Sequence, residues 1–411
     1  MTDHSPVLPI PWPNLVTMFL DQADRYGDRP LLWAKRQGEY VGLTWADVAD
    51  QVCRLASGLK ALGIRPGDRV VLVSENRPEW AISDLAIMAA GAVTVPAYTT
   101  NTAADHLHIL SNCGARGVIA SSAKLTRTVV AAADRGTDLA VAVSLDPPPR
   151  DHQHTPRIVP WNEALELGSR NTAPIRDEAA TISADQLACL IYTSGTGGAP
   201  KGVMLHHGAI LHNCEGAARL LAEFGGEPTA HVFLSFLPLS HAYEHTVGQF
   251  LPLRLGAQIY YAEGVDKLLT NVAEVRPTIM SAVPRFYELL QQRISQAAHK
   301  SGGLRGAHVF RRHCVGPKTL SLTPRSGTAA TTGRYSAGPS RASANSGPVR
   351  WAADRHGLRW CTAQCRRRDL SARRRTAGIP GLRANRGRPP YQRQPPPADQ
   401  ASYGWTADRR C

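Results

Sequence analysis

The chain has 411 residues and a formal net charge of +14, and no apolar run approaches the roughly 18 residues of a membrane span, so we expect no transmembrane segment. Its eight cysteines have spacings that fit neither a zinc site nor a small disulfide framework, which excludes a disulfide-stabilised secreted domain and indicates reduced thiols. The net charge differs between two parts of the chain. Residues 1–302 hold 25 basic and 29 acidic side chains, whereas residues 303–411 hold 22 basic and four acidic ones.

Apolar spacing predicts alternating helices and strands in the first 300 residues. Thr44 is a favourable N-cap for an amphipathic helix that runs to about Leu62. A buried parallel strand, a second helix and another strand follow at residues 70–73, 79–90 and 93–96. Later apolar runs predict strands at residues 117–120, 139–145, 187–192, 232–237, 258–261 and 278–283. We therefore expect an α/β fold with mostly parallel sheets.

A loop of small polar residues and glycines follows one of these strands and ends at a lysine. Residues 190–204 read LIYTSGTGGAPKGVM, and we expect a helix from about Val203. Glycines let several backbone N–H groups turn inward, hydroxyls donate further hydrogen bonds, and Lys201 supplies a positive charge. Such a loop can hold nucleotide phosphates at the carboxyl end of a strand or the start of a helix. Because Pro200 precedes the lysine and Gly202 follows it, the Walker A pattern of kinases and GTPases is not met.

The stretch Tyr192–Gly202 resembles the signature loop of the adenylate-forming superfamily, usually written YTSGTTGxPKG. Ten of the eleven positions match, counting the free one, and the departure is Gly197, where the family has Thr or Ser. The resemblance implies that Lys201 is catalytic and that Thr196 contacts a metal ion. It also implies nucleotide contacts at Tyr192, Thr193, Ser194, Gly195, Thr196, Gly197, Gly198, Lys201 and Gly202. The alternative is a turn that is merely rich in small residues.

Other segments resemble the same superfamily in the expected order. Residues 43–80 are similar to its N-terminal subdomain, and residues 91–98 to the GAVxVPxY stretch that follows. Residues 236–245, FLPLSHAYEH, resemble the second core motif, in which a histidine lies beside the carboxylate being activated. Residues 277–288, PTIMSAVPRFYE, resemble the VPRxxE stretch of the long-chain members. The resemblance covers about residues 15 to 300.

Within the second motif the resemblance makes His241 the residue that orients the acyl carboxylate or lines the acyl pocket. Taken alone, a histidine after a strand is more often a structural residue. We expect Glu244 and His245 to be ordinary residues at a helix N-terminus. Arg285 is either a functional cation or a surface one.

Residues 303–411 have the composition of a chain that does not fold. They contain 21 Arg, one Lys and no Glu, and Ile, Leu, Val and Phe make up only 11 of the 109 residues, too few to offset the entropy of ordering. Cys361 and Cys365 have no second ligand pair, so we expect no metal there. We therefore expect the last 105 or so residues to be disordered.

The superfamily's later motifs do not appear in this tail, which indicates divergence, truncation or a shifted reading frame. The missing parts are GYGxTE, whose tyrosine packs on adenine and whose glutamate binds Mg²⁺, and the lysine of a small C-terminal domain. Read one nucleotide forward, residues 381–405 permit the sequence GYGQTEAAPLISVNRPRRIKLHTVG. We therefore hypothesise that the chain leaves its frame between about Gln291 and Gly306.

These observations predict that residues 1–302 are a partial AMP-binding (adenylation) domain, belonging to an N-terminal large domain of two stacked αβαβα subdomains. The resemblance implies a long-chain fatty acid–CoA ligase that uses ATP, Mg²⁺ and coenzyme A and forms an acyl-adenylate intermediate. Without its later motifs, we expect this chain to be inactive. The alternatives are a ligase for another acceptor or an aryl acid, and a basic tail that binds nucleic acid. We expect a cytoplasmic protein, with peripheral membrane contact left open.

Overall fold

The computed structural model describes residues 10–148, 156–193, 199–223, 227–284, 286–288 and 291–292. All of them belong to one compact unit, Met1–Arg334. The predicted disorder and the predicted frame change of the tail lie outside the described residues. In the part that is described, no helix is long and apolar enough to cross a membrane, and the four cysteines are free thiols.

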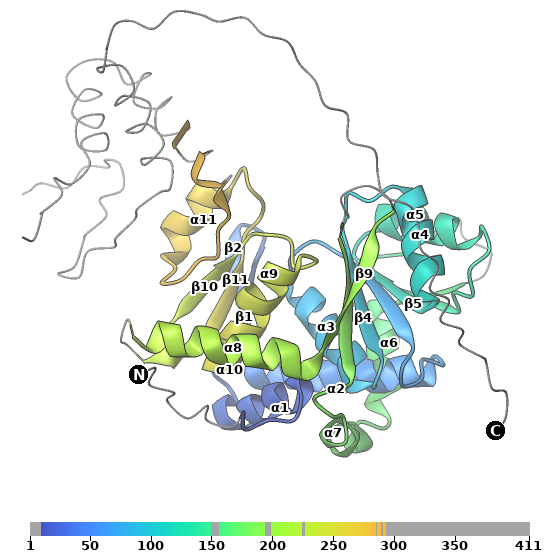
Figure 1. Ribbon diagram of the computed structural model, residues 1–411, viewed down its shortest axis with the longest axis horizontal. Helices are drawn as coiled ribbons and strands as arrows, with labels where there is room; N and C mark the ends of the chain where they lie inside the picture. Colours follow the sequence, from blue (N-terminus) through green and yellow to red (C-terminus); the bar gives the residue numbers. More distant parts are fainter. Residues whose placement is uncertain are drawn as a thin grey trace, which may run out of the picture. The chain divides into compact units, whose positions relative to one another are not determined.

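The larger of two sheets has seven strands in the order β7-β6-β5-β3-β4-β8-β9 (Figure 1). Six strands run parallel, and β9 is an antiparallel edge strand. The strands are β3 (Arg69–Val73), β4 (Val93–Ala97), β5 (Ala115–Ala120), β6 (Val141–Ser144), β7 (Arg157–Pro160), β8 (Leu187–Thr193) and β9 (Lys201–His206). Strand order reverses between β3 and β5, so the carboxyl ends of these strands form the kind of edge at which open α/β sheets bind ligands.

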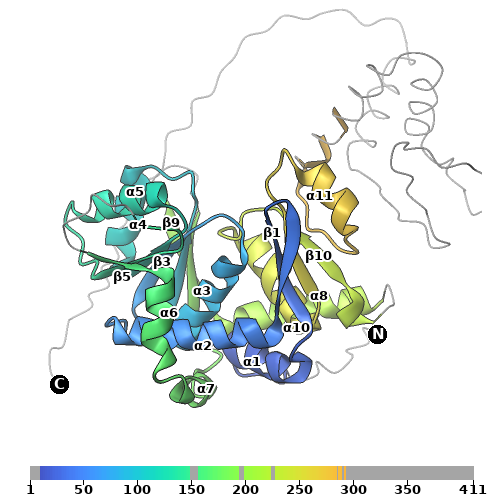
Figure 2. The same cartoon turned by 180° about the vertical axis from the view of Figure 1, so that it is seen from behind.

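Helices cover both faces of this sheet, which explains why its central strands are apolar throughout. Alternate residues of β3 face two separate cores: Val70 and Leu72 pack in the larger one, and Val71 and Val73 in the smaller one. Helices α4 (Ala103–Cys113) and α5 (Ala123–Ala133) belong to the smaller core, and they lie apart from the helices of the larger one (Figure 2). Four other helices pack in the larger core: α2 (Trp45–Ala61), α3 (Pro78–Ala89), α6 (Trp161–Ser169) and α7 (Ala173–Ala180).

The smaller sheet has four strands in the order β10-β11-β1-β2. They are β1 (Pro30–Arg36), β2 (Glu39–Thr44), β10 (Val232–Ser235) and β11 (Gln258–Tyr261), and only β2 is antiparallel. Its helical elements are α1 (Leu15–Tyr26), α8 (His207–Ala222), η1 (Pro228–Ala230), α9 (Ala242–Glu244), the π-helix η2 (His245–Phe250), α10 (Leu251–Leu255) and α11 (Leu268–Val275). Helix α3 lies between the sheets, and one continuous core contains residues of both (Figures 1 and 2).

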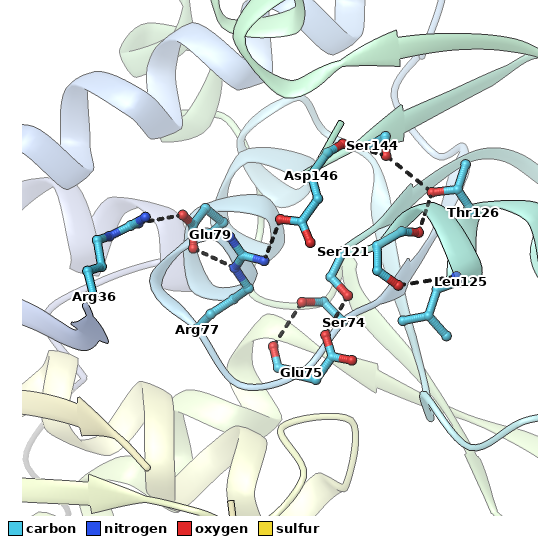
Figure 3. Close-up of polar contacts among 11 residues, drawn as sticks. Arg36, Ser74, Glu75, Arg77, Glu79, Ser121, Leu125, Thr126, Ser144 and Asp146 are labelled. Atoms are coloured by element: carbon cyan, nitrogen blue, oxygen red, sulfur yellow. Dashed lines mark hydrogen bonds and ion pairs between the residues drawn. The ribbon is translucent and has the colours of Figure 1, made fainter. Parts of the chain in front are cut away.

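Polar side chains fasten the carboxyl ends of β3, β5 and β6 to one another (Figure 3). The Ser121 hydroxyl donates to the Glu75 carboxylate, which joins β5 to β3. The Arg77 guanidinium donates to Glu79 at 2.8 Å and to Asp146 at 3.0 Å, which joins the start of α3 to the end of β6. The bonds fix the segment that leads from β3 into α3.

The sequence predicts most of these elements correctly. Thr44 caps α2, and with Asp47 it forms a capping box. The predicted strands at residues 70–73, 93–96, 117–120, 139–145, 187–192, 232–237 and 258–261 correspond to β3, β4, β5, β6, β8, β10 and β11, and the helix at residues 79–90 corresponds to α3.

Two predicted elements are wrong. The helix expected from about Val203 is the strand β9, because the backbone at Val203 pairs with Ile191 of β8, and α8 begins only at His207. The strand expected at residues 278–283 is reduced to a single bridge between Ile279 and Phe233.

Candidate functional site

The signature loop joins two strands that form a hairpin. Strand β8 ends at Thr193 and β9 begins at Lys201, and these two residues face each other across the hairpin. Both side chains are exposed, and no described residue forms an ion pair with Lys201. Five predicted contacts lie outside the described residues, including the predicted metal contact Thr196: they are Ser194, Gly195, Thr196, Gly197 and Gly198.

The Tyr192 side chain contacts both the opposite strand of the hairpin and helix α4. Tyr192 is only 7% exposed, and its ring lies over Gly202, where a Cβ atom would come within 3.2 Å of the ring. Its hydroxyl donates a 2.6 Å hydrogen bond to Oδ1 of Asn112 on α4. Burial raises the pKa of Tyr192 to about 12, so the hydroxyl remains a donor at neutral pH. The tyrosine and the last glycine of the signature therefore fit each other.

His241 lies at the exposed N-terminus of α9, as a cap. Its Nδ1 accepts a 3.2 Å hydrogen bond from the backbone N–H of Tyr243. A neutral imidazole whose Nδ1 is an acceptor carries its proton on Nε2. No described residue bonds to Nε2, so His241 presents an N–H donor to solvent.

Asn76 holds the segment that leads to His241, and the sequence analysis did not single it out. Its side-chain amide donates to Ser235 Oγ at 3.0 Å and to the Leu237 carbonyl at 2.7 Å. Its Oδ1 accepts a 3.1 Å bond from the Leu239 N–H. Asn76 follows β3 of the larger sheet, whereas its partners follow β10 of the smaller one. One side chain thus fixes the second motif to the carboxyl edge of the seven-stranded sheet.

Glu244 is fully buried, which the sequence did not predict. Its carboxylate accepts hydrogen bonds from the hydroxyls of Ser235, at 2.8 Å, and Ser281. Burial outweighs these bonds and raises the pKa of Glu244 to about 7. Gly248 makes room for it, since a Cβ atom there would lie 2.4 Å from the carboxyl carbon.

His245 belongs to the core and not to an exposed site. Its Nε2 lies 2.8 Å from Oδ2 of Asp84, which also accepts a 2.7 Å bond from the Gln249 amide, and all three side chains are buried. Although burial disfavours a charged ring, the adjacent Asp84 carboxylate raises the pKa of His245. This pair fixes η2 to α3. His245 begins η2, as the prediction of a helix N-terminal residue has it, but the sequence did not predict its burial against Asp84.

Aromatic side chains gather where the second motif meets the stretch that resembles VPRxxE. The rings of Phe236 and Phe286 are 5.0 Å apart, and that of Tyr287 lies 5.6 Å from Phe286. Tyr243, two residues after His241, is 43% exposed. Arg285 lies outside the described residues.

A metal site is not formed by the described residues. Among them, no group of three or more His, Cys, Asp or Glu side chains could hold an ion. The predicted Mg²⁺ contact, Thr196, lies outside the described residues.

Comparisons with known proteins agree with the motifs. A family model described as "AMP-binding enzyme" matches residues 19–342, which extends past the boundary near residue 302 that charge predicts. The chain is 28% identical over 293 residues to the long-chain-fatty-acid–CoA ligase ACSBG2 of Gallus gallus, covering 70% of this chain and 38% of that protein. It is 30% identical over 297 residues to the ligase ACSBG1 of Homo sapiens, covering 70% and 40%. The chain thus spans about two fifths of these relatives.

The fold also matches a solved structure. The long-chain-fatty-acid–CoA ligase FadD1 of Archaeoglobus fulgidus superposes with a TM-score of 0.59 at 19% identity, over 71% of this chain and 56% of that one. At this identity the match concerns the fold alone. It confirms the predicted α/β large domain.

Proposed function

This chain belongs to the AMP-binding enzyme family, and from that premise we propose that it is part of a ligase that activates a long-chain fatty acid with ATP. In the first step a carboxylate oxygen attacks the α-phosphorus of ATP, the bond to the bridging oxygen breaks, and pyrophosphate leaves. In the second step the thiol of coenzyme A attacks the acyl carbonyl, AMP leaves, and the thiol proton passes to solvent. Relatives named as such ligases support this acid and this acceptor.

One observation carries the proposal: both motifs lie at the same edge of the seven-stranded sheet. Strands β3, β4 and β8 are parallel, so their carboxyl ends share an edge. The signature loop follows β8 directly, and Asn76, just after β3, fixes the second motif there. A phosphate-binding loop and a carboxylate-binding histidine would have to approach each other in this way.

Each exposed group has a simple chemical task in the first step. The ammonium group of Lys201 would offset the negative charge of the phosphates, and backbone N–H groups of the loop would donate to them. The free Nε2–H of His241 would donate to the acid carboxylate and orient one of its oxygens towards phosphorus. Mg²⁺, which we expect to arrive with ATP, would supply further charge compensation.

The aromatic side chains of the second motif and of the VPRxxE-like stretch support an acid with an alkyl chain. The rings of Phe236 and Phe286 contact each other and are only partly buried, so they leave apolar surface for such a chain. Burial of a methylene group is worth about 0.8 kcal/mol, so a longer chain gains affinity from such a surface in proportion to its length. Palmitate is therefore the first acid to test.

Pyrophosphate exchange tests the proposal. With palmitate and ATP, an in-frame version of the enzyme should exchange labelled pyrophosphate into ATP, and Lys201→Gln should lower kcat/KM for ATP by roughly 100-fold. The matched control is Lys124→Gln, which alters an exposed lysine on α5 and should leave exchange unchanged. Equal exchange by the two variants would contradict the proposal.

We further propose that residues 303–411 are read out of frame and that the 411-residue chain does not turn over. The chain would lack the later groups that hold adenine and stabilise the transition state, and each such group counts for powers of ten in rate. Sequencing the gene across codons 291–306 tests the frame. Robust turnover by the purified chain would overturn this view of its activity.

A further inference from the structure

We infer that His108 and Asn112 of α4 are positioning residues that hold the two ends of the signature loop. The inference deepens the proposed function, on which it rests, because neither residue lies in a recognised motif. The two are four residues apart and therefore lie on one face of the helix. One contacts the strand that enters the loop, and the other contacts the segment that leaves it.

Asn112 contacts the entering strand. The Tyr192 hydroxyl donates its 2.6 Å bond to Oδ1 of this residue. Because the Tyr192 ring also lies over Gly202, the bond fixes the cross-strand pair at the base of the loop. Asn112 itself is exposed, so its side chain can be changed without opening the core.

His108 contacts the segment that leaves the loop. Its Nε2 lies 2.8 Å from the carbonyl oxygen of Pro200, the residue before Lys201. A carbonyl oxygen only accepts, so Nε2 must be the donor. The ring also meets Tyr192 edge-on, with 6.1 Å between centroids. His108 thus contacts both sides of the loop.

Helix α4 is a firm base for these contacts. A capping box of Thr102 and Asp105 begins it, and Gly114 ends it in the left-handed conformation. Its buried side chains Ile109 and Leu110 pack in the smaller core. Because α4 is fixed by its caps and its core contacts, His108 and Asn112 can restrict the movement of the residues at the two ends of the loop.

The hairpin needs such support because β9 is an edge strand. Among the described strands it pairs only with β8, and its Val203 and Met204 side chains are 45% and 68% exposed. Without the two contacts from α4, the open end of the hairpin can separate, and Lys201 would no longer be held opposite Thr193. The expected consequence is weaker binding of ATP phosphates rather than unfolding.

Matched substitutions in the in-frame version of the enzyme, the same protein as in the pyrophosphate-exchange test, test the inference. His108→Leu removes the donor, whereas His108→Gln keeps an N–H donor at similar reach. Asn112→Leu removes the acceptor at the other end, and Ser111→Ala is the control on the same turn of α4. Two measurements are needed: equilibrium titration with ATP, and amide hydrogen exchange at residues 201–203 without nucleotide.

We expect His108→Leu and Asn112→Leu each to weaken ATP binding and to speed exchange at these amides by about three- to tenfold, the effect of one hydrogen bond. His108→Gln should restore both, and Ser111→Ala should change neither. If His108→Leu does not fold, Asn112→Leu at its exposed position provides the same comparison.

The outcomes separate this inference from the proposed function. Absence of ATP binding by the unmodified in-frame enzyme would overturn both. Normal ATP binding and unchanged exchange in the two leucine variants would overturn the inference alone. Equal losses in His108→Leu and His108→Gln would also overturn it, since a side chain that acts only by its shape would produce that result.

Discussion

The buried carboxyl of Glu244 should make this fold less stable at pH 8 than at pH 5, and Glu244→Gln should remove that loss. Burial raises the pKa of this carboxyl from 4.5 to about 7 in the folded chain. A raised pKa means that the folded state holds its proton more tightly than the unfolded state. The stabilising effect of protonation is therefore fully present below pH 4.5 and is lost as the pH rises through about 7.

The size of the effect follows from the shift. One pKa unit corresponds to about 1.4 kcal/mol, so the full shift corresponds to about 3 kcal/mol. Of this stabilisation, about 2.5 kcal/mol is lost as the pH rises from 5 to 8. The amide of the variant cannot ionise, and it can still bond to the hydroxyls of Ser235 and Ser281.

Urea unfolding followed by tryptophan fluorescence measures the effect. The free energy of unfolding is measured for the parent chain and for Glu244→Gln at pH 5, 6, 7 and 8, and the difference between the two is plotted against pH. Other titrating groups cancel in that difference. We expect it to move in favour of the variant as the pH rises. Glu166→Gln, an exposed position on α6, is the control. A difference for Glu244→Gln that stays constant across this range would refute the reasoning.

Two further predictions concern packing and charge. Gly202→Ala should destabilise the chain by about 1 to 3 kcal/mol, because its Cβ would meet the Tyr192 ring at 3.2 Å, whereas Gly216→Ala, with open space around it in α8, should stabilise it by about 0.5 to 1 kcal/mol. Urea midpoints of the two variants compare them directly, and equal signs would contradict the argument. Asp84→Ala should cost about 3 to 5 kcal/mol, because it leaves His245 buried without its partner. The same urea titration measures this cost, and a loss below 1 kcal/mol would show that the pair does little for stability.

The sequence by itself determined the fold class and the motifs. Thr44 as a cap and the apolar runs of β3 and β4 depend on local spacing, which a reader of the sequence can measure directly. The signature loop is also local, since ten matching positions lie within one stretch. The family match confirms the assignment made from it.

The tertiary structure decided which residues support the site. Asn76 and Leu237 are 161 positions apart, and His108 and Pro200 are 92 apart, so no periodicity reveals either contact. The wrong helix at Val203 has the same origin, because a short apolar run fits a helix or a strand until a partner such as β8 is available to pair with it. Local patterns specify elements, whereas contacts between distant residues depend on how the sheets order their strands, and only the folded chain contains that information.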